Sequence, residues 1–322
     1  MTKLLSRYTI KLLTRWSIER WLKMIATTSP STTQASLDLS DVETTALLTL
    51  YARALESMSP DPILTDPHAE RIVALIDDRL SGTQDRLLGM LRSHKIDPSL
   101  AVHIALRAQK YDQYARDFLS RHPAGVVTSL GCGLDTRFQR IDNGQVTFFD
   151  IDLPAMIRFK RGLLPETPRY GLIASSVFDY AWMEPVAGAA ASAAKGNPVL
   201  FLAEGLFMYL DPDKVRQLVL HLQRRFPRSE LACEVVNKRF ASGAFGKITA
   251  MKMQRRMKLG KGSAFTFGVA SPDEMESWNA GIQYLERWSY FESNHPKLGW
   301  LRLFRHVKPM NNVQYTVRYQ LG

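Results

Sequence analysis

Residues 126–152 have the sequence VVTSLGCGLDTRFQRIDNGQVTFFDID. The first five of them are β-branched or apolar, apart from one serine, which is typical of a buried strand. Gly131 and Gly133 follow directly, and a second apolar run leads into Asp150 and Asp152. A strand, a glycine turn, a helix and a second strand that ends in an acid form the layout of a nucleotide-binding βαβ unit.

The spacing between the glycines and the acids supports a nucleoside site. Gly131 precedes Asp150 by 19 residues and Asp152 by 21, which brackets the roughly 20 expected before an acid that binds ribose hydroxyls. Asp150 and Asp152 are two apart, so we expect them to share one side of a strand. Gly131 and Gly133 allow a tight turn and close approach of a ligand. An ordinary glycine turn of an α/β protein remains the alternative.

The third glycine of the dinucleotide pattern is replaced by Thr136. That glycine lets a helix lie close to the strand, so that the helix N-terminus can hold a pyrophosphate. A nucleoside cofactor without phosphates, such as S-adenosylmethionine, does not need it. An NAD(P)-dependent oxidoreductase would use the same unit and stays open as an alternative, although no catalytic tyrosine–lysine or histidine arrangement accompanies it.

Length and composition favour one large core. The chain has 322 residues, 45% of them hydrophobic, enough for an α/β domain with a cap. The two cysteines, Cys132 and Cys233, show no metal-ligand spacing, so we expect reduced thiols, a cytoplasmic protein and no metal site. The sequence has no apolar run of about 18 residues, so no spanning helix is predicted.

The positive charge is concentrated near the N-terminus. The net charge is +11, and residues 1–36 carry a surplus of five, which leaves +6 on the rest, within the ordinary range for a soluble protein. Residues 1–25 have the pattern of a basic amphipathic helix. It could contact an anionic membrane surface, direct the chain to an organelle, or be a translated upstream extension, with Met24 as the natural start. We assign 1–36 to an extension and linker and 37–322 to the main domain.

Strands and helices alternate along the main domain. The ends of four successive strands carry Gly131, Asp152, Ser176 and Glu204, and ligands bind at this edge of parallel sheets. The expected helices are 41–57, 68–76, 99–119 and one from 211 to 225, and the expected strands after the βαβ unit are 170–174, 199–203, 231–236 and 315–321.

A basic stretch separates the last two of these strands. Residues 238–261 contain eight lysines and arginines and no acid. This indicates either a solvated helix face or a mobile basic lid that attracts an anionic substrate, and we assign 238–270 to a lid insertion. The aromatic residues that follow could line an apolar pocket: Phe265, Phe267, Trp278, Trp288 and Tyr290.

Six motifs occur in one order with close spacing. They are YARALES at 51–57, RAQKYD at 107–112, GCGLDTRF at 131–138, FDIDLP at 149–154, ASSVFD at 174–179 and LAEGLFMYL at 202–210. Over about residues 41–322 the chain resembles the leucine carboxyl methyltransferase-like family, in the branch of the bacterial polyketide-type O-methyltransferases. The resemblance implies a class I S-adenosylmethionine-dependent methyltransferase fold of the α/β, Rossmann-like type. Such a fold has a seven-stranded, mostly parallel sheet with an antiparallel last strand, N-terminal helices and a lid.

The resemblance also implies roles for individual residues. Ser176 stands where the carboxyl methyltransferases have an acid. The implied contacts are the methionine part of the cofactor for Gly131 and Gly133, the ribose for Asp152, the adenine for Ser176 and Val177, the amino group for Glu204, and the carboxylate for Arg107, with Arg53 as a second candidate at that pole.

The expected reaction is in-line methyl transfer from a sulfonium to an oxygen. Positioning can supply roughly 7–11 kcal/mol. A carboxylate acceptor is ionised at neutral pH and needs no base, whereas a phenol would need one. Tyr209, beside the Glu204 motif, is the candidate for hydrogen bonding to the substrate. We therefore predict an S-adenosylmethionine-dependent O-methyltransferase acting on a carboxylate or hydroxyl of a small molecule, polyketide-like or another secondary metabolite. A nucleic-acid-binding or inactive methyltransferase-like protein is a further alternative, although the basic clusters carry no interleaved base-stacking motifs.

Overall fold

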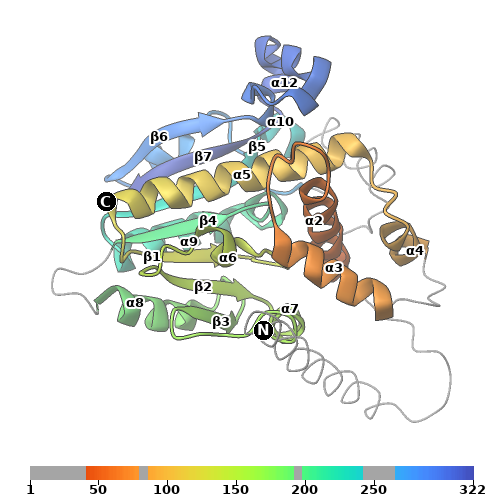
Figure 1. Ribbon diagram of the computed structural model, residues 1–322. Coiled ribbons are helices and arrows are strands. Elements are labelled where there is room, and N and C mark those ends of the chain that lie inside the picture. The colour runs from red at the N-terminus through yellow and green to blue at the C-terminus, as the bar shows by residue number, and fades with distance from the viewer. Residues whose placement is uncertain (1–40, 80–85, 192–197, 242–264) are drawn as a thin grey trace.

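A seven-stranded sheet forms the centre of the protein, of which the computed structural model describes residues 41–79, 86–191, 198–241 and 265–322. The strand order is β3-β2-β1-β4-β5-β7-β6 (Figure 1). Strands β1 to β5 are parallel, and β7 is antiparallel to both of its neighbours. The strands are β1 (Val126–Leu130), β2 (Thr147–Asp152), β3 (Tyr170–Ala174), β4 (Val199–Ala203), β5 (Ser229–Val236), β6 (Ile282–Trp288) and β7 (Gln314–Leu321).

The central strands are buried on both faces. Every residue of β1, β4 and β5 is buried, and in β4 this gives a continuous apolar run rather than an alternating one. Successive side chains point to opposite faces. Val127 accordingly packs in the core on one side of the sheet, and Val126 packs in the core on the other.

Helices cover both faces of the sheet. One core joins the sheet to α2, α3 and α5, and the opposite core joins it to α8 and α9. The helices are α2 (Asp41–Ser57), α3 (Pro67–Arg79), α4 (Arg86–Arg92), α5 (Pro98–Arg121), α6 (Arg137–Ile141), α7 (Pro154–Arg161), α8 (Met183–Ala191), α9 (Pro212–Arg225), α10 (Lys238–Ala241) and α12 (Lys308–Asn311). Short 3-10 helices are η1 (Tyr180–Trp182), η2 (Phe207–Tyr209), η4 (Glu274–Trp278), η5 (Tyr290–Glu292) and η6 (Pro296–His306).

Aspartate–proline pairs begin three of the long helices. In α5 and α9 the carboxylates of Asp97 and Asp211 accept the first free backbone N–H groups, and proline takes the next position. Asp66 does the same for α3, where its Oδ1 accepts from the backbone N–H of Ala69 at 3.0 Å. Each cap satisfies donors that the helix itself leaves unpaired.

The predicted fold class, the α/β class I methyltransferase architecture, is confirmed. Strands 170–174 and 199–203 and helix 41–57 occur with the predicted bounds. Strand β6 and helix α8 were not predicted, because β6 is exposed along much of its length and α8 is a short, alanine-rich segment. The predicted extension 1–36 and most of the predicted lid, 242–264, lie outside the described residues.

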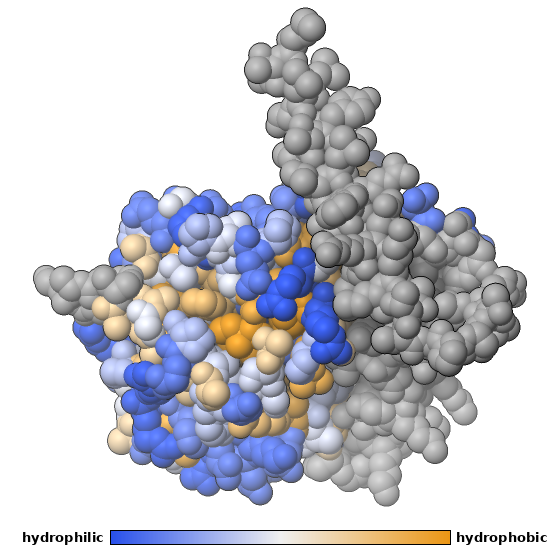
Figure 2. All heavy atoms as spheres, turned by 90° about the horizontal axis from the view of Figure 1, so that it is seen from below, coloured by the Kyte–Doolittle hydropathy of each residue, from blue (hydrophilic) through white to orange (hydrophobic). Residues whose placement is uncertain are grey.

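The surface near the β3 edge of the sheet is mixed in character. Figure 2, which views the molecule from below Figure 1, shows hydrophilic and hydrophobic side chains interspersed, with a hydrophobic patch near the middle of this face. Among the described residues, no helix is both long and apolar enough to cross a membrane.

Candidate functional site

The loop after β1 has the backbone geometry that the glycines predicted. Gly131 has φ +63° and Gly133 has φ +49°, a left-handed conformation that side chains strongly disfavour. A Cβ on Gly131 would lie 2.7 Å from Cδ1 of Leu206, so a side chain here would also have to displace that leucine. The loop therefore presents backbone without side chains at the carboxyl end of β1.

The carboxylate of Asp152 is hydrogen-bonded to this loop. Its Oδ2 accepts the backbone N–H of Gly133 at 2.7 Å, and its Oδ1 accepts the backbone N–H of Leu153 at 2.7 Å. Burial raises the pKa of Asp152, and these two backbone donors act against that rise. Each carboxylate oxygen retains acceptor capacity beyond one hydrogen bond, so a pair of hydroxyl donors suits the site.

Asp150 is in a different environment from Asp152, although both are buried at the end of β2. One of its oxygens lies 2.7 Å from Nζ of the fully buried Lys160, and the hydroxyl of Tyr170 donates to the same oxygen. The carboxylate of Asp150 thus neutralises a buried lysine of α7. The assignment of Asp150 to the cofactor stays a prediction.

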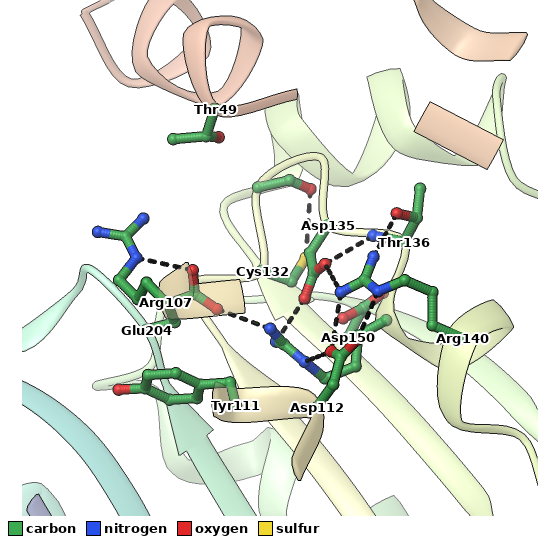
Figure 3. A network of polar contacts seen from close by, with 12 residues as sticks. Thr49, Arg107, Tyr111, Asp112, Cys132, Asp135, Thr136, Arg140, Asp150 and Glu204 are labelled. Atoms are coloured by element: carbon green, nitrogen blue, oxygen red, sulfur yellow. Dashed lines mark hydrogen bonds and ion pairs between the residues drawn. The ribbon is translucent and has the colours of Figure 1, made fainter. Parts of the chain in front are cut away.

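Arg107 and Glu204 meet directly at the end of β4. Nε of Arg107 donates to Oε1 of Glu204 at 2.8 Å, and Nη2 of Arg137 donates to Oε2 at 2.7 Å (Figure 3). Burial acts to raise the pKa of Glu204, but the two guanidinium groups outweigh it and hold the pKa below its ordinary value. Glu204 is therefore a carboxylate held between two arginines.

A buried network of ion pairs holds Arg137 in place beside Glu204. Arg137 also binds Asp112 at 2.8 Å and Asp135, and Arg140 binds Asp112 at 2.7 Å. Asp112 and the side chain of Arg137 are almost fully buried. This network was not predicted from the sequence, although the GCGLDTRF motif has an arginine, Arg137, shortly after the glycine loop.

Arg53 supports the loop from the opposite side. Its Nη2 donates to the backbone carbonyl of Leu134 at 2.7 Å, and its Nε lies 3.3 Å from Asp66. Asp66 also binds Arg140 at 2.8 Å. The guanidinium of Arg53 thus holds the glycine loop in place, and its contact with the methionine pole stays a prediction.

Ser176 and Val177 follow β3 on the far side of Asp152. Oγ of Ser176 accepts the backbone N–H of Phe178 at 3.3 Å, and the carbonyl of Val177 accepts from the indole of Trp182 at 3.1 Å. Asp179 caps η1 through Ala181. The segment lies beside the carboxyl end of β2, because β3 pairs with β2 as far as Asp152 and Ala174. Its contact with an adenine stays a prediction.

Tyr209 and Glu234 lie next to Arg107. Nη1 of Arg107 binds Glu234 at 3.1 Å, and Gln314 donates to the other oxygen of Glu234 at 2.5 Å. Burial, together with Glu234, raises the pKa of Tyr209 to about 12, so its hydroxyl keeps its proton at neutral pH. The ring of Tyr209 packs against Phe265, with centroids 5.7 Å apart. Glu234 was not predicted as a site residue, because it lies inside the buried strand β5 and belongs to no recognised motif.

The described residues contain no cluster of histidine, cysteine or acidic side chains that could hold a metal ion. Instead, the features at this edge form a row across adjacent strands. Asp152 ends β2, the glycine loop follows β1, and Glu204 follows β4 with Arg107 beside it. A glycine loop, a carboxylate and an ionic pole in this order on a 3-2-1-4-5-7-6 sheet are the layout of a class I S-adenosylmethionine-dependent methyltransferase.

Comparisons with known proteins agree with this class. The family model for leucine carboxyl methyltransferase matches residues 46–223. The tetracenomycin polyketide synthesis O-methyltransferase TcmP of Streptomyces glaucescens is 30% identical over 262 residues, which cover 80% of this chain and 86% of that protein. The S-adenosyl-L-methionine-dependent methyltransferase dpfgK of Gibberella zeae is 28% identical over 264 residues, 79% of this chain and 84% of its own length.

A solved structure shares the fold. The crystal structure of a DUF574 family protein from Streptomyces avermitilis aligns with a TM-score of 0.52 and 14% identity, over 87% of this chain and 100% of that one. The chain belongs to the leucine carboxyl methyltransferase family, as its motifs predicted.

Proposed function

We propose that this protein transfers a methyl group from S-adenosyl-L-methionine to an oxygen of a small organic molecule, either a carboxylate or a hydroxyl. The methyl donor is the cofactor for which the relative from Gibberella zeae is named. The oxygen acceptor, in a polyketide-like or other secondary metabolite, is proposed by analogy with the relative TcmP. The observation that carries the proposal is the row of Asp152, the glycine loop, and the Arg107–Glu204 pair along the carboxyl edge of the sheet.

The proposed cofactor contacts follow this row. Asp152 accepts the ribose hydroxyls, the backbone of Gly131 and Gly133 lies along the methionine part, and Ser176 with Val177 flanks the adenine. Strands β2 and β4 are separated by two strand spacings, roughly 10 Å. That separation suits a ligand whose ribose lies at one end and whose amino acid lies at the other.

At the amino acid end, Glu204 accepts from the ammonium group and Arg107 donates to the carboxylate. Arg107 already binds two carboxylates, so the cofactor carboxylate would share its guanidinium with Glu204 or Glu234. The five N–H donors of a guanidinium permit such sharing. Arg137, held by Asp112 and Asp135, keeps Glu204 ionised and in position.

The bound cofactor supplies an electrophilic methyl on a sulfonium. The chain has to hold the acceptor oxygen in line with it, which can contribute roughly 7–11 kcal/mol to catalysis. Tyr209, protonated and beside Glu234, is proposed to donate a hydrogen bond to the acceptor.

Binding of S-adenosylhomocysteine tests the proposal. At a hundredfold excess over its dissociation constant, a ligand that binds only the folded state adds about 2.7 kcal/mol to the free energy of unfolding. NADP and a short RNA serve as comparison ligands for the alternative functions. Stabilisation by NADP or RNA, with none by S-adenosylhomocysteine at millimolar concentration, would refute the proposed function.

A further inference from the structure

Four large apolar side chains are exposed in one short segment before β7. Trp300, Leu303, Val307 and Met310 have exposed fractions of 68%, 61%, 42% and 39%. They lie in η6, in α12 and at the residue between the two, and this part of the chain projects from the molecule beyond β6 and β7 (Figure 1). We call residues 300–310 the projecting segment. Exposed apolar side chains gathered in this way indicate a contact with another protein or with a membrane.

The projecting segment is attached to the protein by other apolar side chains. Leu301 packs against the core cluster that α5 forms with residues 63–64. The ring of Phe304 lies against that of Phe291, with centroids 5.3 Å apart. Trp300 touches Phe304 with ring centroids 5.4 Å apart and still exposes most of its surface. The segment is therefore apolar on two sides, of which one is packed and the other faces outward.

The charged side chains of the projecting segment are basic. Arg302, Arg305 and Lys308 are exposed, and the sequence contains no aspartate or glutamate from residue 293 to residue 322. Arg305 donates to the side-chain oxygen of Asn294 at 3.1 Å, a neutral partner. Within the described part of the chain, none of these three cations forms an ion pair with a carboxylate. Their charge is thus available to an anionic partner.

This combination of charge and exposed apolar surface suits an anionic lipid membrane. Tryptophan is enriched at the level of the lipid headgroups, and segments that lie on a membrane bury Trp and Leu there. Lysine and arginine beside them are attracted to the phosphates of anionic lipids. A second copy of the chain fits less well, because a symmetric dimer would bring the same three cations against each other. A projecting element can also enter the headgroup layer without a matching groove in its partner.

We propose that the projecting segment docks the protein on the surface of anionic phospholipid membranes. Its four exposed apolar side chains enter the headgroup layer, and its three unpaired cations contact the lipid phosphates. The contact is peripheral, since no helix among the described residues is long and apolar enough to cross a membrane. The proposal goes beyond the proposed function and does not depend on it.

Cosedimentation with vesicles tests the role of the charges. The full chain is mixed with vesicles of phosphatidylcholine, either alone or with about a third of phosphatidylglycerol, at about 0.1 M salt. The wild type should bind the anionic vesicles much more tightly than the neutral ones. The double variant Arg302→Gln/Lys308→Gln should weaken this binding by about 30-fold, because each cation near an anionic surface contributes roughly fivefold. The control Arg216→Gln/Arg224→Gln removes the same charge from exposed positions of α9, and its affinity should stay close to that of the wild type.

A fluorescent label shows whether the projecting segment itself meets the lipid. Residues 1–25 are also basic and lie outside the described residues, so total binding does not identify the contact. Leu303→Cys is labelled with a nitrobenzoxadiazole dye, from which the two native cysteines are protected by burial. With anionic vesicles the emission should shift to the blue, and lipids that carry a spin label near the headgroup should quench it. The same dye in Glu184→Cys, at an exposed position of α8 on the opposite face of the sheet, should show neither change.

The possible results either support the proposal or overturn it. It is overturned if the wild type does not bind anionic vesicles, if it binds neutral vesicles equally well, or if both charge variants lose the same affinity. Unchanged emission of the dye at position 303, while the protein sediments with the vesicles, would assign the contact to another part of the chain. Dimerisation of the wild type without lipid binding, abolished in Leu303→Gln, would instead make the projecting segment an interface between two copies.

Discussion

Asp150 and Asp152, two residues apart in β2, allow a direct test of the site, because their carboxylates bind different partners. Asp152 holds the glycine loop at the ligand edge, whereas Asp150 neutralises the buried Lys160. Exchange of each carboxylate for the isosteric amide, in Asp152→Asn and Asp150→Asn, removes one charge with little change of shape. The two substitutions lie two residues apart and serve as controls for each other.

The expected magnitudes follow from the partners of each side chain. A hydrogen bond to a charged group contributes about 1.5–3 kcal/mol, so Asp152→Asn should weaken binding of adenosine and of S-adenosylhomocysteine by about ten- to a hundredfold. Asp150→Asn leaves Lys160 buried without its counter-charge, which typically costs about 3–5 kcal/mol of stability. The folded fraction of Asp150→Asn should bind nucleosides with an affinity close to that of the wild type.

Isothermal titration calorimetry with adenosine and S-adenosylhomocysteine, together with denaturant unfolding, measures both quantities. Adenosine lacks the amino acid part and therefore reports on the ribose and adenine end alone. Equal loss of adenosine affinity in the two variants would refute the assignment of the ribose to Asp152 rather than Asp150. A fall in stability with unchanged affinity in Asp152→Asn would assign this residue a purely structural role.

Three further predictions concern the loop, the amino acid pole and the ionic network. Gly131→Ala forces a side chain into a positive φ beside Leu206, so it should cost at least about 1–2 kcal/mol of unfolding free energy, and an unchanged denaturation midpoint would contradict the close packing. Arg107→Ala should abolish most of the affinity difference between S-adenosylhomocysteine and adenosine, and calorimetry that finds equal losses for both ligands would exclude a contact with the carboxylate. Burial acts to raise the pKa of Asp66, but Arg140 and Arg53 outweigh it and hold the pKa below its ordinary value. Its stabilising contribution is therefore complete above its ordinary pKa, about 3.9, and is lost as pH falls through the lower folded value. Asp66→Asn should accordingly flatten the fall of stability below pH about 4, and unfolding curves that keep the wild-type slope would show that other carboxylates cause it.

Much of the fold could be predicted from local patterns. Both 170–174 and 199–203 are strands with the predicted bounds. For 199–203 the reason is that a parallel strand buried on both faces leaves a continuous apolar run in the sequence. Helix α3 begins at Pro67 with Asp66 as its cap, a local signal that acts within one turn. Strand β6 has no such signal, since its outer residues face water and its pairing with β7 alone makes it a strand.

The sequence by itself determined the family and the glycine loop, and it singled out Asp152, Glu204 and Arg107, which the structure places at the carboxyl edge of the sheet. Those features lie in short motifs whose chemistry is local. The tertiary structure decided which charges meet: that Asp150 faces Lys160, that Asp112 and Asp135 hold Arg137, and that Glu234 and His103 lie beside Arg107. Residues 103 and 290 are far apart in the chain, yet their rings stack because α5 and η5 pack together over the sheet. Ion pairs and ring contacts of this kind depend on distance in space, and sequence separation carries no information about it.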